Sequence, residues 1–342
     1  MELYGKKLTK EEFMKYVGDP SQVADARPCV LSEGKADGVR AIEVKTGGGL
    51  HFTVLPTRGM DIAWAEYNGK ALSFISKTGV THPAYFEKDG LSFLRGFFCG
   101  LVTTCGLTYF GAPCEDDGQS LGLHGRISNT PADGVCIEKY WDGDEYILKI
   151  HGQVRESSVF GENIVLIREI ETKLGGKSLK ITDRIQNQGF NQQPFMLLYH
   201  CNFGYPIVSE NTILTEPKGT VVTARDSEGV VEKCFEFQKP THDYAEQVFY
   251  HKLPGKETKA VLYNPDVNLG AYVAFSTEQF SHFGEWKMMG EGDYVVGLEP
   301  SNAIPEGRDV VRRRGELEYI QPGEEKLFEL EIGVVEEAPE QL

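Results

Sequence analysis

Several features that mark common classes of protein are missing from this sequence of 342 residues. No apolar run approaches the length that crosses a membrane, and the first 19 residues contain no apolar segment long enough for a signal peptide. The seven cysteines include no C-x-x-C pair, and their odd number argues against a disulfide framework. We therefore expect reduced thiols and a cytoplasmic protein.

Positive charge is also scarce. The chain has 35 lysines and arginines against 51 aspartates and glutamates, which gives a formal net charge of −16. Because such a surface repels phosphate backbones and anionic lipids, we expect no nucleic acid and no membrane as partner. A small molecule is the better expectation. A homodimer is left open, since the edges of sheets can pair without leaving a mark in the sequence.

Motifs for the commonest cofactors and catalytic machineries are absent as well. The sequence contains no G-x-G-x-x-G before a helix, no Walker loop, no H-E-x-x-H and no G-x-S-x-G. These absences disfavour dinucleotide, ATP, metalloprotease-type zinc and common serine hydrolase chemistry. We expect no cofactor and no metal.

What the sequence does contain is a series of segments with a period of two. Near the C-terminus, Phe328, Leu330 and Ile332 alternate with glutamates, as in a strand with one buried and one solvated face. Asn68-Gly69 is typical of a two-residue hairpin. Many strands without helical crossovers predict an all-β fold, a large antiparallel β-sandwich or barrel. Further strands are predicted at residues 50–56, 146–150, 164–172 and 179–186.

One short helix precedes these strands. Thr9 and Glu12 fit a capping box, and Gly18-Asp19-Pro20 ends the helical pattern. Residues 76–135 are glycine-rich and weakly periodic, and a loop region of that length usually builds a functional site. The predicted organisation is a helical arm at 1–34, a β-sandwich domain at 35–337 and a tail at 338–342.

Three segments carry side chains suited to acid–base chemistry. His124 lies in Leu123-His124-Gly125-Arg126, within the irregular region, and His200 ends an apolar run that then turns through Asn202. Glu299 ends a second apolar run just before a proline. Desolvation among valines and leucine would raise the pKa of this carboxyl, as a general base at neutral pH requires. Each residue, taken alone, is more often structural.

Taken together, these segments resemble the aldose 1-epimerase (galactose mutarotase) superfamily, over roughly residues 35–335. Arg95-Gly96 followed by His124-Gly125 resembles the arginine-glycine and H-G segments of that superfamily. His200-Cys201-Asn202-Phe203 is similar to its H-x-Y-x-N/F turn, and Val296-Gly297-Leu298-Glu299-Pro300 to its V-x-x-E-P segment. The resemblance is nearest to an uncharacterised mutarotase-like branch.

The resemblance implies a galactose mutarotase-like β-sandwich and a cofactor-independent isomerase that interconverts the anomers of an aldose. Glu299 would act as the base on the anomeric hydroxyl and His200 as the acid on the ring oxygen, assisted by His124. The residues predicted to bind the substrate are Arg58, Arg95, Arg126, Asn202, Glu246, Gln247 and Lys287. Glu246 stands where the family has an aspartate, with Asp243 close by, which leaves the identity of the sugar open.

Two other functions remain open at this point. The same histidines and Glu299 could ligate a divalent metal, as in cupin-type isomerases, although no two histidines lie two residues apart on one predicted strand. The protein could also bind or sense a carbohydrate without turning it over. Metal analysis tests the first alternative, and measurement of anomer exchange tests the second.

Overall fold

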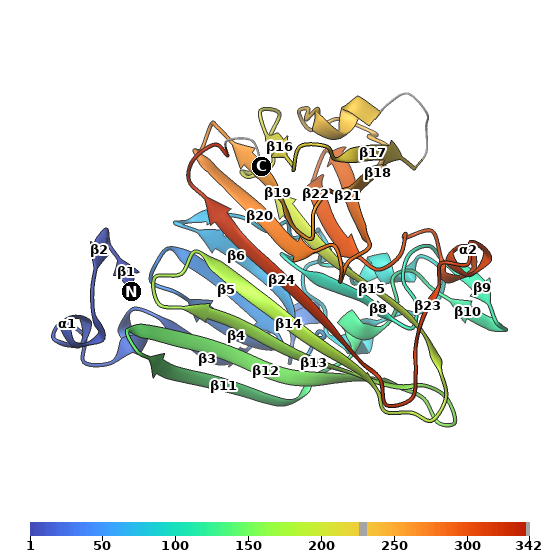
Figure 1. Cartoon of the computed structure of the whole chain (residues 1–342), viewed down its shortest axis with the longest axis horizontal. Helices are drawn as coiled ribbons and strands as arrows, with labels where there is room; N and C mark the ends of the chain where they lie inside the picture. The colour runs from blue at the N-terminus through green and yellow to red at the C-terminus, as the bar shows by residue number, and fades with distance from the viewer. Residues whose placement is uncertain (226–230, 340–342) are drawn as a thin grey trace.

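Antiparallel strands are the main elements of the molecule (Figure 1). The computed structural model describes residues 1–225 and 231–339, so residues 340–342 of the predicted tail lie outside the described residues. Its three large sheets contain eight, seven and five strands. The predicted all-β class and the antiparallel β-sandwich are therefore confirmed. No helix in the described ranges combines the length and apolar character needed to cross a membrane.

The eight-stranded sheet contains the strands with the clearest period of two. Ile181 and Leu330 are directly paired across two central strands, and both are buried against the core. In order across the sheet, the strands are β11 (Asp133–Asp142), β12 (Glu145–Ser157), β13 (Asn163–Lys173), β14 (Ser178–Asn187), β24 (Glu325–Val335), β20 (Leu269–Ser276), β19 (Glu257–Asn264) and β16 (Ile213–Thr215).

The seven-stranded sheet contains the runs that end at His200 and Glu299. Its strands are β17 (Val221–Ala224), β18 (Gln247–Lys252), β21 (His282–Gly290), β22 (Asp293–Ser301), β15 (Gln193–Gly204) and β23 (Glu318–Ile320), and β8 (Thr103–Leu107) also pairs with β15. The strand β8 lies within the region that was expected to be irregular. All five of its residues are buried, so they show no alternation of apolar and polar positions.

The five-stranded sheet begins inside the predicted N-terminal arm. Its strands are β3 (Asp25–Val30), β4 (Arg40–Lys45), β5 (Leu50–Leu55), β6 (Asp61–Tyr67) and β7 (Lys70–Ala71). Tyr67 pairs with Lys70, which confirms the hairpin at Asn68-Gly69. Because β3 pairs with β4, the boundary expected after residue 34 falls within one sheet.

The remaining elements are short. Thr9 and Glu12 form the predicted capping box, but α1 (Lys10–Met14) is shorter than the helix expected over residues 9–18. The other elements are α2 (Arg308–Arg313), the hairpins β1 (Glu2–Leu3) with β2 (Lys6–Lys7) and β9 (Cys114–Asp116) with β10 (Gln119–Leu121), and the 3₁₀ helices η1 (Pro20–Gln22), η2 (Gly34–Ala36), η3 (Pro83–Tyr85), η4 (Ser92–Arg95), η5 (Ile127–Asn129) and η6 (Val231–Phe235).

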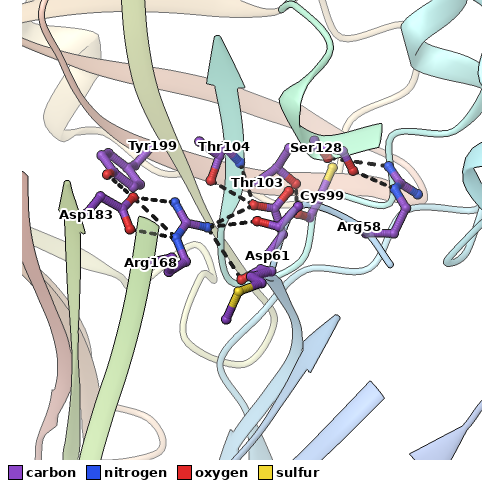
Figure 2. Close-up of polar contacts among 11 residues, drawn as sticks. Arg58, Asp61, Cys99, Thr103, Thr104, Ser128, Arg168, Asp183 and Tyr199 are labelled. Carbon is purple, nitrogen blue, oxygen red and sulfur yellow. Dashed lines mark hydrogen bonds and ion pairs between the residues drawn. The ribbon is translucent and has the colours of Figure 1, made fainter. Parts of the chain in front are cut away.

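A buried ionic network joins the three large sheets. Arg168 on β13 lies 2.6 Å from Asp183 on β14 and 3.3 Å from Asp61 on β6, and none of these side chains is exposed. Tyr199 on β15 donates its hydroxyl to Asp183 (Figure 2). Removing Arg168 would leave two buried carboxylates uncompensated, at a cost of about 3–5 kcal/mol. The network therefore fixes β15, the strand that carries His200, relative to the rest of the fold.

Candidate active site

One face of the seven-stranded sheet brings together His200 on β15, Glu299 on β22 and Trp286 on β21. Directly paired residues share a face of a sheet, and positions two apart on a strand share it too. Gly297 pairs with both Asn202 and Trp286, and it lies two residues before Glu299. The strand register thus places these side chains on one surface, which we call the site face.

His200 and Glu299 are in direct contact. The Nε2 atom of His200 lies 3.1 Å from Oε1 of Glu299, and each side chain is only 4 % exposed. Gly297 provides the space for this contact. A Cβ atom at that position would lie 2.8 Å from Glu299 Oε1 and 3.0 Å from His200 Cε1, too close for either. The glycine two residues before the glutamate is therefore part of the site's construction.

His124 reaches the same place from the loop after β10. Its φ is 58°, a left-handed conformation that is held by backbone hydrogen bonds to Gly106 and Gly111. The neighbouring Gly125 packs against β8, where a Cβ atom would lie 2.3 Å from the carbonyl oxygen of Gly106. The ring centroids of His124 and His200 are 5.7 Å apart, and Nδ1 of His124 has no hydrogen-bond partner among the residues that the structure describes. The H-G dipeptide thus presents an imidazole to the pair.

Aromatic rings surround the two histidines. Phe97 lies 5.2 Å from His200 and Phe93 lies 5.4 Å from His124, measured between ring centroids. Trp286, which is half-buried, lies 5.2 Å from His200 on the other side. Phe93 and Phe97 were missed in the sequence, because their short irregular segment shows no periodicity. Their positions on either side of Arg95 were the available signal.

The low-polarity surroundings shift the pKa of all three ionisable groups toward the neutral form. Burial, with a smaller contribution from the charge of Glu246, raises the pKa of Glu299 to about 8. Burial and the neighbouring His124 lower the pKa of His200 to about 3, and burial lowers that of His124 to about 4. Between pH 3 and 8, the His200–Glu299 pair therefore holds one proton, and these pKa values place it on the Glu299 carboxyl.

Four of the residues predicted to bind substrate occupy different positions around this pair. Asn202 is buried on the site face and donates its amide to the carbonyl of His200. Glu246 accepts a 2.9 Å hydrogen bond from Trp286 Nε1. Arg126 is partly exposed and lies 3.6 Å from Glu156. Arg95 is exposed, with its Nε 3.8 Å from Glu87. Asn202 thus contacts His200 of the pair, and Glu246 contacts the neighbouring Trp286.

Arg58 does not lie at this cluster, contrary to the expectation from the sequence. Its side chain is fully buried, and its guanidinium donates to the carbonyl oxygen of Ser128 (Figure 2). It also donates to the carbonyl oxygens of Thr81 and Gly96. Because all of these acceptors belong to the chain itself, Arg58 has a structural role. It ties together three loop segments of the region 76–135.

Gln247 and Lys287 also differ from the expectation. They are paired with each other across β18 and β21, and Lys287 is adjacent to Trp286, so both point to the face opposite the site face. Tyr244 donates its hydroxyl to the side-chain oxygen of Gln247. Lys287 is buried and donates to the backbone carbonyl of Lys233, 2.6 Å away. Neither side chain is placed to contact a substrate held by His200 and Glu299.

The comparison with known families covers most of the chain. A family model described as a domain of unknown function, DUF4432, matches residues 36–334. The chain belongs to this family. No curated protein matches the sequence.

Solved structures share the fold. A protein from Klebsiella pneumoniae subsp. pneumoniae, provisionally described as an aldose 1-epimerase, is 27 % identical, with a TM-score of 0.87 over 93 % of this chain and 86 % of that chain. A galactose mutarotase-like protein from Clostridium acetobutylicum is 15 % identical, with a TM-score of 0.61 over 92 % and 99 % of the two chains. The predicted galactose mutarotase-like β-sandwich, and the resemblance to that superfamily, are therefore confirmed.

Proposed function

We propose that this DUF4432 protein is a cofactor-independent isomerase that interconverts the α and β anomers of an aldose. The observation that carries the proposal is the 3.1 Å contact between His200 Nε2 and Glu299 Oε1 in surroundings that leave one proton on the pair at neutral pH. Such a pair can donate and accept a proton within one turnover without a net change in its own charge. The fold of the Klebsiella pneumoniae protein supports the same class of reaction.

The mechanism follows from the arrangement of the two groups. To form the reactive state, the single proton of the pair moves from Glu299 to His200, which leaves Glu299 as a carboxylate. Glu299 removes the proton from the anomeric hydroxyl while His200 protonates the ring oxygen, so the bond between the ring oxygen and the anomeric carbon breaks and an open-chain aldehyde forms. Rotation about the adjacent carbon–carbon bond and reversal of both proton transfers give the other anomer. The pair ends with the single proton with which it began.

Other side chains have supporting roles in this proposal. His124, which is neutral at physiological pH, is positioned to donate a hydrogen bond to the ring oxygen or to share its proton. Trp286 offers an aromatic face to the apolar C–H groups of a sugar ring. Glu246, fixed on Trp286 Nε1, is the candidate acceptor for sugar hydroxyls. Arg126 and Arg95 are candidates for contacts with outer hydroxyl or acidic groups of the substrate.

The proposal is tested by NMR exchange spectroscopy of a panel of neutral, acidic and phosphorylated aldoses. The wild-type protein should accelerate α/β exchange of at least one sugar above the spontaneous rate, and His200→Asn should lose about 10²–10⁴-fold of that acceleration. A sugar that binds without faster exchange would instead identify a carbohydrate-binding protein. Loss of exchange on treatment with a chelator, with the fold retained, would favour the metal-dependent alternative.

A further inference from the structure

A second cluster of ionisable side chains lies on the opposite face of the seven-stranded sheet. His251 on β18 and Glu285 on β21 point away from the site face, since Glu285 pairs with Phe249 and not with the strand positions that carry the site. Cys234, in η6, lies beside them. All three residues are buried, Glu285 and Cys234 completely. The mechanism proposed above uses none of them.

The potential ligand atoms of these three residues converge. The Cys234 thiol sulfur, a ring nitrogen of His251 and a carboxylate oxygen of Glu285 all lie within 4.8 Å of one another. The Nε2 atom of His251 is 3.3 Å from Oε2 of Glu285. In a tetrahedral zinc site with metal–ligand bonds of about 2.1 Å, two ligand atoms lie ~3.4 Å apart. The separation of His251 and Glu285 therefore matches that of two ligands around one ion, and the sulfur lies within 4.8 Å of both.

These atoms also lack hydrogen-bond partners. Neither oxygen of Glu285 has one in the described residues, and neither does Nε2 of His251. A buried carboxylate without partners is costly unless a cation compensates it. The nearby cation Lys287 donates instead to backbone carbonyls of the segment that carries Cys234, those of Lys233 and Cys234 included. Its ammonium group thus fixes the backbone beside Cys234 and makes no hydrogen bond to Glu285.

Glu216 contacts the other ring nitrogen of His251. Its carboxylate contacts Nδ1 of His251, with the closer oxygen 2.8 Å away, and its side chain is 3 % exposed. This contact fixes the ring and directs Nε2 toward Glu285 and Cys234. A carboxylate on the outer nitrogen of a histidine is the usual support for a metal-binding imidazole, because it sets both tautomer and orientation.

We propose that Cys234, His251 and Glu285 bind a divalent cation of the Zn²⁺ class, in a buried site on the side of the sheet opposite the site face. Thiolate, imidazole and carboxylate form a normal ligand set for zinc. Binding displaces two protons to solvent, one from the Cys234 thiol and one from Nε2 of His251, and with Glu216 and Lys287 the occupied cluster has no net charge. The ion would join η6 to β18 and to β21, and β21 is the strand that carries Trp286.

A proton is the competitor for the same position. Protonated His251 could bridge Glu216 and Glu285, and this state is also neutral when Lys287 is counted. It leaves the Cys234 thiol without a role. The two states differ in one measurable respect: only the metal state contains a bond to sulfur.

The test is the metal content of the purified full-length protein, measured by elemental analysis after growth with added zinc. The wild-type protein should contain about one zinc per chain, and Cys234→Ser should retain less than about a tenth of that. Cys201→Ser removes another buried cysteine and should keep the metal. Cys136→Ser should keep it too, although Cys136 lies near Glu138 and His151 in an exposed group of potential ligands.

Cobalt substitution keeps the test decisive if the Cys234 variant does not fold. The wild-type protein loaded with Co²⁺ should show a near-ultraviolet thiolate-to-cobalt absorption band, and Cys136→Ser should show the same band. A wild-type protein without zinc and without this band would overturn the proposal, as would a band that disappears in Cys136→Ser. These measurements do not depend on sugar turnover, so the proposed isomerase function can fail independently.

Discussion

The two faces of the seven-stranded sheet each carry a buried histidine–glutamate pair. On the site face, His200 Nε2 lies 3.1 Å from Glu299, and on the opposite face His251 Nε2 lies 3.3 Å from Glu285. Residue types, distances and burial are nearly the same. The neighbours differ: aromatic rings and a second imidazole surround the first pair, whereas Glu216, Cys234 and Lys287 surround the second.

This difference in neighbours reverses the charge state of the histidine. Burial lowers the pKa of His200 to about 3. Burial also acts against the charged form of His251, but the hydrogen bond with Glu216 and the negative charges of Glu216 and Glu285 outweigh it and raise its pKa to about 9 when no metal is bound. A compensated pair is suited to hold an ion or a fixed charge. The burial-shifted pKa values of the first pair suit it to proton transfer instead, because perturbed values of this kind are typical of catalytic acids and bases.

The largest expected effect comes from removing the carboxylate on each face in turn. Glu299→Gln should lower the rate of anomer exchange by about 10²–10⁴-fold while sugar binding persists, because the amide fits the space but cannot accept the proton. Glu285→Gln should instead lower the free energy of unfolding, by about 3–5 kcal/mol, since it removes one partner from a buried charged cluster. Exchange NMR and chemical denaturation of both variants measure the two effects. Equal losses of turnover per folded molecule would contradict the distinction between the faces.

The second largest expected effect is a fall of kcat/KM at alkaline pH. Glu299 has a raised pKa of about 8, and above that pH the His200–Glu299 pair loses its single proton and with it the acid for the ring oxygen. The rate should therefore be constant between neutral pH and 8 and should fall about tenfold for each further pH unit. A rate that rises through pH 8 would show that Glu299 acts as an independent base without the shared proton.

The smallest effect comes from the charge of Glu246. Its carboxylate contributes to the raised pKa of Glu299, so Glu246→Gln should lower that pKa and move the falling limb of the pH profile to lower pH by a fraction of a unit. Glu291→Gln, which neutralises an exposed carboxylate beside His242, is the matched control and should leave the limb in place. If the fall in rate begins at the same pH in the Glu246 variant as in the wild-type protein, the charge of Glu246 does not influence the pKa of Glu299.

Much of the fold could be predicted from the sequence, because alternation is a local signal. Residues such as Phe328, Leu330 and Ile332 occupy one face of β24 as their spacing indicated. The strand β8 was not predicted, since it is buried on all sides and only its pairing with β15 defines it. The extent of the N-terminal arm depended in the same way on a non-local contact, the pairing of β3 with β4.

The candidate site could be predicted where a residue ends a buried strand, as His200 and Glu299 do. Site residues could not be predicted where their role depends on the face of the sheet to which the side chain points. Trp286 and Lys287 are consecutive, and a shift of one residue in a strand exchanges the two faces. The structural role of Arg58 could not be predicted either. Its acceptors are carbonyl groups of residues 81, 96 and 128, which lie near it only in the folded chain.

The most direct test is a ¹³C NMR titration of the Glu299 side-chain carboxyl, assigned by its disappearance in Glu299→Gln. If the site face keeps one proton on its carboxyl–imidazole pair at neutral pH, this carbon should titrate with a midpoint near 8. A midpoint near the usual glutamate value of 4.5 would show an ordinary carboxylate at pH 7 and would contradict the account.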